Sequence, residues 1–230
     1  MKNLSKGLSY LAFGYLLGAC SSGAEEHHEA AHTNHEQHTQ HAQHTQQEAH
    51  AGHEHVHQAT LPVATPLPDV SIYQLESRWT DQSNQSFTLA SLRGKPTVVL
   101  MFYGSCTTVC PLLISDLLRL DALLDARVRA QTQYLLVSFD PATDTPVRLA
   151  ELARTRQLDT NRFRLVTGSE ADIRAFANTL GVQYRRTSDG QYAHSMVLSL
   201  LDANGVLHTQ VEGTGQPLDP MATALAQLVP

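Results

Sequence analysis

The sequence predicts an α/β domain of three layers, with helices on both faces of a sheet, preceded by a histidine-rich segment. Three observations lead to this prediction. After residue 69, apolar runs of strand length alternate with stretches of helical periodicity. The chain of 230 residues is long enough for one buried core plus appendages. Finally, 11 of the 13 histidines lie between His27 and His57, a density that no core explains and that points to metal or proton chemistry.

Residues 1–19 are typical of a lipoprotein signal peptide. Lys2 and Lys6 precede a mostly apolar run of 13 residues, which is too short to span a bilayer. The run ends in Leu-Gly-Ala-Cys, which resembles the lipobox of bacterial lipoproteins and implies cleavage before Cys20 and lipidation of that cysteine. An ordinary secretory signal or an uncleaved anchor is the alternative. We therefore expect an extracytoplasmic protein, lipid-anchored to the periplasmic face of a bacterial membrane.

Residues 20–60 form a His-rich tether in this prediction. Almost all of them are Ser, Gly, Ala, Glu, His, Gln or Thr, a composition that buries too little apolar surface to fold and so predicts disorder. Imidazoles at irregular spacing favour weak, exchangeable binding of Cu(II), Zn or Ni. A solvated spacer that titrates is the alternative. Residues 61–68, with three prolines, predict a stiffer linker.

Residues 69–230 are the predicted globular domain, in which apolar runs indicate the strands. We expect strands over 71–74, 85–89, 96–103, 134–139, 164–167, 194–202 and 206–211. The last two form a hairpin through an Asn-Gly turn. After residue 57 the chain has 14 basic and 16 acidic residues. The net charge of −6 and the pI near 6.1 of the whole chain argue against nucleic acid as a partner.

Apolar residues at helical spacing indicate the helices. The first follows Cys110-Pro111, where four leucines recur at this spacing, with Ile114 and Leu118 widening the apolar stripe. The others are expected over 147–156, 171–180 and 220–228. Pro146 can begin the second helix, and Gly181 can end the third.

Cys106 and Cys110 lie where a buried strand turns into a helix. Residues four apart on a first helical turn project to the same side, so both sulfurs can approach one point. The helix N-terminus favours the thiolate form. Two thiolates can hold a soft cation such as Cu(I), or they can form a disulfide. A purely structural disulfide would close only a short loop and add little stability.

Two histidines lie outside the tether. His208 falls in the middle of a predicted strand and can simply face solvent. His194 begins a strongly apolar stretch beside a predicted loop, and its position alone fits a packed side chain as well as a metal ligand.

Three segments together resemble the signatures of the SCO/SenC family, and the resemblance extends in order from Val70 to Leu228. The segments are 102–111 with both cysteines, 137–146 with Asp-Pro-Ala-Thr-Asp-Thr, and 192–195 followed by 200–205. The resemblance implies a thioredoxin-like fold that binds one copper through Cys106, Cys110 and His194. Two positions depart from the family pattern: Thr107 stands where proline is frequent, and Thr143 replaces the usual arginine.

By this resemblance the protein is a copper metallochaperone rather than an enzyme. Copper, as Cu(I) or Cu(II), would pass by ligand exchange to the dinuclear centre of a copper-accepting cytochrome c oxidase subunit, and a copper donor protein could load the site. The alternative is a thiol–disulfide oxidoreductase that uses Cys106 and Cys110 to keep the target's cysteines reduced. A peroxide-handling enzyme is a third reading, but no arginine lies near Thr107 and Thr108 in sequence.

Overall fold

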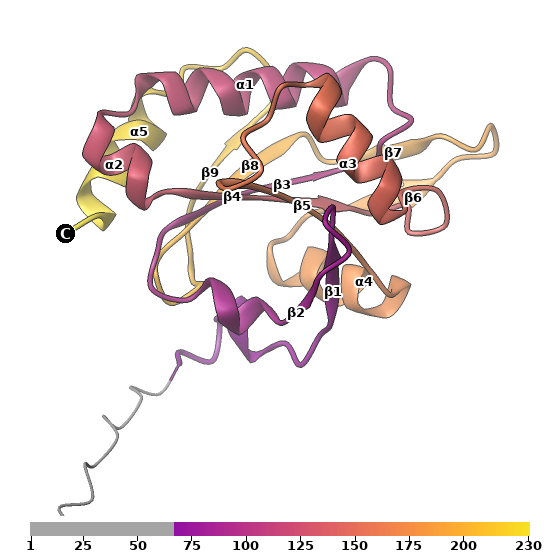
Figure 1. Cartoon of the computed structure of the whole chain (residues 1–230), viewed down its shortest axis with the longest axis horizontal. Coiled ribbons are helices and arrows are strands. Elements are labelled where there is room, and N and C mark those ends of the chain that lie inside the picture. The colour runs from indigo at the N-terminus through magenta and orange to yellow at the C-terminus, as the bar shows by residue number, and fades with distance from the viewer. Residues whose placement is uncertain (1–66) are drawn as a thin grey trace, which may run out of the picture. The chain divides into compact units, whose positions relative to one another are not determined.

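The structure, a computed structural model, describes residues 67–230 (Figure 1). The predicted signal peptide, the His-rich tether and most of the Pro-rich linker lie outside the described residues. The buried hydrophobic core runs from Ile72 to Val229, so a fragment of residues 58–230 contains the whole core and is expected to fold on its own. Within the described residues, no helix has both the length and the apolar character needed to cross a membrane.

A seven-stranded mixed sheet forms the middle layer, in the order β2-β1-β5-β4-β3-β8-β9. Its strands are β1 (Trp79–Asp81), β2 (Ser86–Phe87), β3 (Thr97–Phe102), β4 (Gln133–Ser138), β5 (Phe163–Gly168), β8 (Val197–Leu201) and β9 (Leu207–Glu212). The central three are parallel, and the flanking strands pair antiparallel. All six residues of β3 are buried, which confirms the prediction of a strand covered on both faces.

Helices cover both faces of this sheet. Those described are α1 (Val109–Leu123), α2 (Ala126–Gln131), α3 (Pro146–Thr155), α4 (Glu170–Thr179) and α5 (Asp219–Leu228). Figure 1 shows α1 and α3 on one face and α4 on the other, while α5 packs against α1 and β9. The arrangement confirms the predicted three-layer α/β class.

Local chemistry explains where these helices begin and end. Pro146 occupies the first turn of α3, and the Thr145 hydroxyl accepts a hydrogen bond from the Arg148 N–H. The Ser169 hydroxyl caps α4 in the same way. Gly181, at φ +67°, follows α4 in the left-handed conformation that the sequence predicted there.

The expected strand over 71–74 is wrong. This segment holds a short 3₁₀ helix, η1 (Ile72–Gln74), because the Ile72 N–H donates to the Gly205 carbonyl and the Ser71 hydroxyl donates to the Asn204 carbonyl. These bonds fix the segment to a distant turn instead of a sheet ladder. The partner of β2 is β1, and the residues after β2 form a second 3₁₀ helix, η2 (Leu89–Leu92).

Two further corrections concern α1 and the segment around His194. Leu118 is 37% exposed, so it does not widen the buried stripe of α1. The single strand expected over 194–202 is two strands, β7 (Tyr192–His194) and β8. β7 pairs with β6 (Tyr184–Arg186) in a separate two-stranded hairpin, and the expected loop around residues 187–190 is the turn of this hairpin.

Candidate metal centre

The predicted ligands are brought together at one edge of the sheet. β3 and β4 are parallel, with Phe102 opposite Ser138, so the loops that follow both strands leave the sheet side by side. β8 runs antiparallel to β3 and therefore begins at the same edge. The loop after β3 carries Cys106, and β7, which precedes β8, carries His194. Three segments that are distant in sequence thus converge.

Cys106 lies in the loop before α1 rather than on its first turn, which corrects the sequence expectation. Thr108 is the N-cap residue of α1, but its side chain makes no capping hydrogen bond. The Cys106 sulfur takes that place, because the Cys110 N–H donates to Sγ at 3.3 Å. A sulfur that accepts backbone N–H bonds at a helix N-terminus is held where negative charge is favoured. The Cys110 thiol nevertheless hydrogen-bonds to the Cys106 sulfur, so the two side chains are in contact.

The two thiols have very different pKa values. Burial would raise the pKa of Cys106, but the N–H groups of Cys110, Thr108 and Val109 and the Cys110 thiol stabilise its thiolate, and the pKa falls to about 7. Burial raises the pKa of Cys110 to about 12, and the neighbouring Cys106 and Asp144 charges act in the same direction. Near neutral pH a substantial fraction of Cys106 is therefore thiolate, whereas Cys110 remains a thiol. Both cysteines are free thiols rather than a disulfide. Both are buried: Cys106 is 7% exposed and Cys110 is 2% exposed.

His194 directs one ring nitrogen at this pair. Its Nε2 lies 3.9 Å from the Cys110 Sγ, and its Nδ1 lies 2.9 Å from the Ser195 carbonyl oxygen. A carbonyl oxygen only accepts, so Nδ1 carries the proton, and in the neutral ring Nε2 presents its lone pair to Cys110. The hydrogen bond to the second ring nitrogen is the arrangement that orients imidazole ligands in metal sites.

Aromatic rings pack around the histidine. The ring of Phe139 lies 5.1 Å from that of His194, and Tyr103 meets His194 edge-on at 6.1 Å. Tyr192 packs against the rings of Tyr103 and Phe139. The Tyr103 hydroxyl donates a hydrogen bond to the Gln191 side chain at 3.0 Å. These contacts bind the β6–β7 hairpin to the loop after β3 and so fix His194 against Cys110.

Asp144 holds the other side of the cysteine loop. Its carboxylate accepts hydrogen bonds from the Gly104 N–H at 2.8 Å and from the Ser138 hydroxyl. A Cβ on Gly104 would lie only 2.5 Å from the Asp144 Oδ1, so the backbone approaches this closely only with glycine. Burial raises the pKa of Asp144 above its ordinary value, although the two hydrogen bonds act in the opposite direction.

The donor set fits copper, although the three predicted ligands are not gathered around one point. Within residues 67–230, no group of three or more His, Cys, Asp and Glu side chains has the spacing of a formed metal site. A sulfur and a nitrogen on one metal lie about 3.6–3.8 Å apart for bond lengths of about 2.3 and 2.1 Å, close to the 3.9 Å between Cys110 and His194. Thiolate and imidazole together suit copper in either oxidation state.

Comparison with known proteins decides the family. The SCO1/SenC family model matches residues 71–230. The chain belongs to this family. A protein of Stutzerimonas stutzeri named for copper binding is 28% identical over 153 residues, which are 65% of this chain and 73% of that protein. The match confirms the resemblance that the three sequence segments indicated.

Solved structures of SCO1/SenC proteins share the fold, which confirms the thioredoxin-like expectation. A SCO1/SenC family lipoprotein from Bacillus anthracis superposes with a TM-score of 0.61 at 26% identity, over 69% of this chain and 96% of that one. ScoI of Bradyrhizobium japonicum with copper bound gives a TM-score of 0.54 at 24% identity, over 66% and 96%.

Sequence reasoning about ligands did not identify the aromatic cluster or Asp144 as parts of the site. Tyr103, Phe139, Tyr192 and Asp144 all lie inside the three segments that resemble the SCO1/SenC signatures. The signal was therefore present, but nothing in the segments themselves says that these side chains meet. His208 lies exposed on β9, as predicted, and takes no part in the site.

Proposed function

We propose that this protein is a copper metallochaperone in which Cys106, Cys110 and His194 bind one copper ion as cargo. The observation that carries the proposal is the approach of the His194 Nε2 to the Cys110 Sγ, beside a Cys106 thiolate held by the N-terminus of α1. The Stutzerimonas relative named for copper binding supports the choice of metal.

A copper ion held by three ligands has an open coordination position, and transfer to another protein can begin there. A thiolate or imidazole of the receiving protein enters that position before the donor ligands detach, so copper moves by exchange and is never free in solution. The recipient we propose is the dinuclear copper centre of a respiratory cytochrome c oxidase. We propose the periplasmic face of a bacterial membrane as the location, with a lipid anchor at Cys20. That the relative from Bacillus anthracis is a lipoprotein supports the anchor.

Copper titration of the reduced 58–230 fragment tests the site. We expect one tightly bound copper per chain, and binding at least about tenfold weaker after Cys106→Ser, Cys110→Ser or His194→Ala. His208→Ala is the matched control, because His208 is exposed on β9, and it should bind copper as the unaltered fragment does. Unchanged binding in all three ligand variants would overturn the assignment.

A second candidate function is thiol–disulfide exchange, which the unequal pKa values of the two cysteines favour. The Cys106 thiolate attacks a target disulfide and displaces one target thiolate, and Cys110 then attacks Cys106 and displaces the second. The Cys110 proton passes to a released thiolate, and two electrons reduce the target. His194 is not needed for this chemistry. Reductase activity that persists in His194→Ala and is lost in Cys106→Ser would demonstrate it; loss in both variants would contradict it.

A further inference from the structure

Beside the metal centre, the hairpin forms the wall of a hollow that the copper site does not use. Its volume is about 330 Å³, and its walls come from β6 and β7, the loop after β4 and the first turns of α4. The rings of Phe139 and Tyr184 stack at 5.0 Å, and Tyr192 lies against Phe139. These three rings make part of the wall of the hollow aromatic. We name this space the arginine hollow, because Arg174, Arg185 and Arg186 line it.

Three exposed arginines line the arginine hollow: Arg174, Arg185 and Arg186. None of them forms an ion pair within 4.0 Å among the residues that the structure describes, whereas Arg119, Arg129 and Arg162 do. Guanidinium groups gathered around one concavity repel each other, and this cost is recovered when an anionic group binds between them.

The arginine hollow lies beside the metal centre, because Phe139 lines it and the Phe139 ring lies 5.1 Å from the His194 ring. A second hollow of about 390 Å³ is lined by His194 and its neighbours on the hairpin, and it shares Tyr184 and Arg185 with the first. A segment bound along the hairpin by the arginines would therefore have its next residues beside His194.

We propose that the arginine hollow docks a carboxylate-rich segment of the protein that exchanges copper with this chain. The planar guanidinium fork pairs bidentately with carboxylates, and the arginines thereby set the orientation in which the partner's copper ligand approaches His194. This inference rests on the proposed chaperone function, but the docking can be measured without copper.

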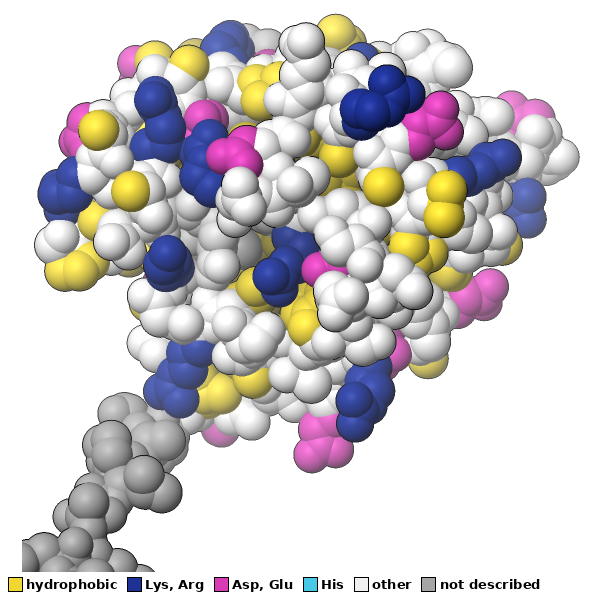
Figure 2. All heavy atoms as spheres, in the orientation of Figure 1, with side chains coloured by type: hydrophobic (Ala, Val, Ile, Leu, Met, Phe, Trp, Pro, Cys, Tyr) yellow, Lys and Arg dark blue, Asp and Glu magenta, His cyan; other side chains and the backbone are white. Residues whose placement is uncertain are grey.

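The shape and charge of the hollow favour a protein segment over a membrane or a nucleic acid. A phospholipid surface is broad, whereas this site is a concavity large enough for a few side chains. Asp140 and Glu170 also line it, and they would repel a dense array of phosphates. Carboxylates spaced along a peptide can approach the arginines while avoiding these two acids. On the face drawn in Figure 2, basic and acidic side chains are likewise interspersed.

Binding of a fluorescent peptide to the 58–230 fragment tests the proposal. The probe is a twelve-residue peptide of alternating Asp and Gly, with an Asn-Gly peptide as its neutral counterpart. We expect the acidic peptide alone to bind, and the double variant R174E/R186E to bind it at least about tenfold more weakly. R78E/R154E is the matched control, since it reverses two exposed arginines outside the hollow and makes the same change in net charge.

Three outcomes would overturn the proposal: equal loss in both double variants, no loss in R174E/R186E, or binding to phosphatidylglycerol vesicles without binding to the peptide. Copper titration of the same proteins separates this proposal from the chaperone function. Retained copper stoichiometry in R174E/R186E with lost peptide binding supports docking. Absence of copper binding in the unaltered fragment would contradict the chaperone function and leave the peptide result standing as a separate finding.

Discussion

At the scale of single residues, the centre depends on the different environments of two chemically identical side chains. Cys106 faces the backbone N–H groups that begin α1, whereas the Cys110 side chain is buried on the helix and hydrogen-bonds to the Cys106 sulfur. The first environment stabilises a thiolate and the second disfavours it. In the proposed exchange chemistry Cys106 is therefore the attacking thiolate, and copper binding at the proposed site would displace a proton from Cys110.

Alkylation of the metal-free, reduced 58–230 fragment tests this asymmetry. The thiolate fraction rises with pH, so the rate at Cys106 should rise with a midpoint near pH 7, while Cys110 stays far slower up to pH 9. Mass spectrometry after iodoacetamide treatment assigns the modified cysteine. In Cys110→Ala the Cys106 sulfur loses a hydrogen-bond donor, and its midpoint should shift to higher pH. Faster alkylation of Cys110 than of Cys106 would show that the assignment is reversed.

At the scale of elements, the cysteine loop keeps its shape because β3, the loop after β4 and the hairpin hold it from different sides. Asp144 binds the Gly104 N–H on one side, and Tyr103 packs on the hairpin at the other. Neither contact uses one of the three predicted metal ligands. The loop is therefore preorganised by its neighbours, so that less ordering is left for copper binding to impose.

Gly104→Ala should disturb this arrangement. The new Cβ would lie 2.5 Å from the Asp144 Oδ1, and that buried carboxylate is held by Ser138 and cannot easily move. We expect a loss of about 1–3 kcal/mol in the free energy of unfolding, measured by urea denaturation of the 58–230 fragment. Ser105→Ala, at the exposed neighbouring position, should change it by less than about 0.5 kcal/mol. Equal effects of the two substitutions would contradict the steric explanation.

The sequence predicts the elements that patterning determines and misses those that distant contacts determine. The buried run of β3 and the leucine spacing of α1 are read directly from the chain. The segment 71–74 has strand-like residues, but the turn at residues 204–205 holds it as η1. α2 was missed although Asp125 caps it, because so short a helix has no apolar period. The pattern around the hairpin of β6 and β7 predicts only a loop next to a longer strand, because the pairing of the two strands leaves no periodic signal.

The candidate site was predicted in the same uneven way. The spacing of four residues singled out the two cysteines as a pair, although Cys106 lies before α1 and only Cys110 is on the helix. His194 could be named as a ligand only through the family resemblance, since its position alone fits a packed histidine equally well. Its approach to Cys110 depends on the aromatic packing of Tyr103, Phe139 and Tyr192, which are far apart in sequence. Such long-range packing leaves no periodic pattern in the chain.

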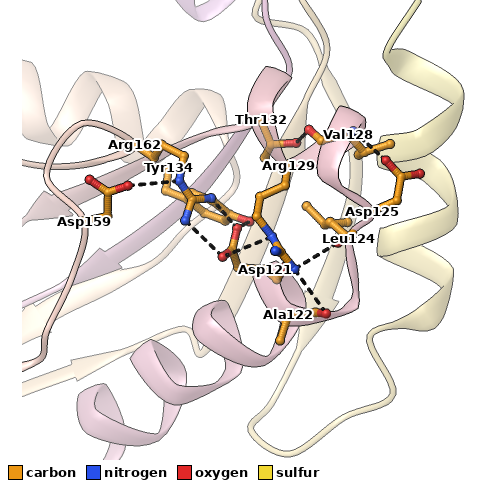
Figure 3. A network of polar contacts seen from close by, with 10 residues as sticks. All are labelled: Asp121, Ala122, Leu124, Asp125, Val128, Arg129, Thr132, Tyr134, Asp159 and Arg162. Atoms are coloured by element: carbon orange, nitrogen blue, oxygen red, sulfur yellow. Dashed lines mark hydrogen bonds and ion pairs between the residues drawn. The ribbon is translucent and has the colours of Figure 1, made fainter.

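At the scale of the whole molecule, an ionic network at the edge of the sheet opposite the metal centre fastens α1 to the domain (Figure 3). Asp121, near the end of α1, accepts hydrogen bonds from the Tyr134 hydroxyl at 3.0 Å and from the Arg162 guanidinium. Arg129 of α2 lies 3.6 Å from the same carboxylate and also donates to three backbone carbonyls. The network therefore joins α1 and α2 to the starts of β4 and β5, far from the cysteines.

Asp121→Asn should lower stability without affecting copper. The change leaves two guanidinium groups without their shared carboxylate, and the Asp121 side chain is only 14% exposed, so we expect a loss of about 1–2 kcal/mol in the free energy of unfolding. Asp159→Asn, which removes a 48% exposed partner of Arg162, should cost less than about 0.5 kcal/mol. Urea denaturation of both variants measures the difference, and copper titration should give one ion per chain in each. If Asp121→Asn lost copper while its stability stayed unchanged, the two ends of α1 would be coupled, and the network would belong to the site rather than to the fold.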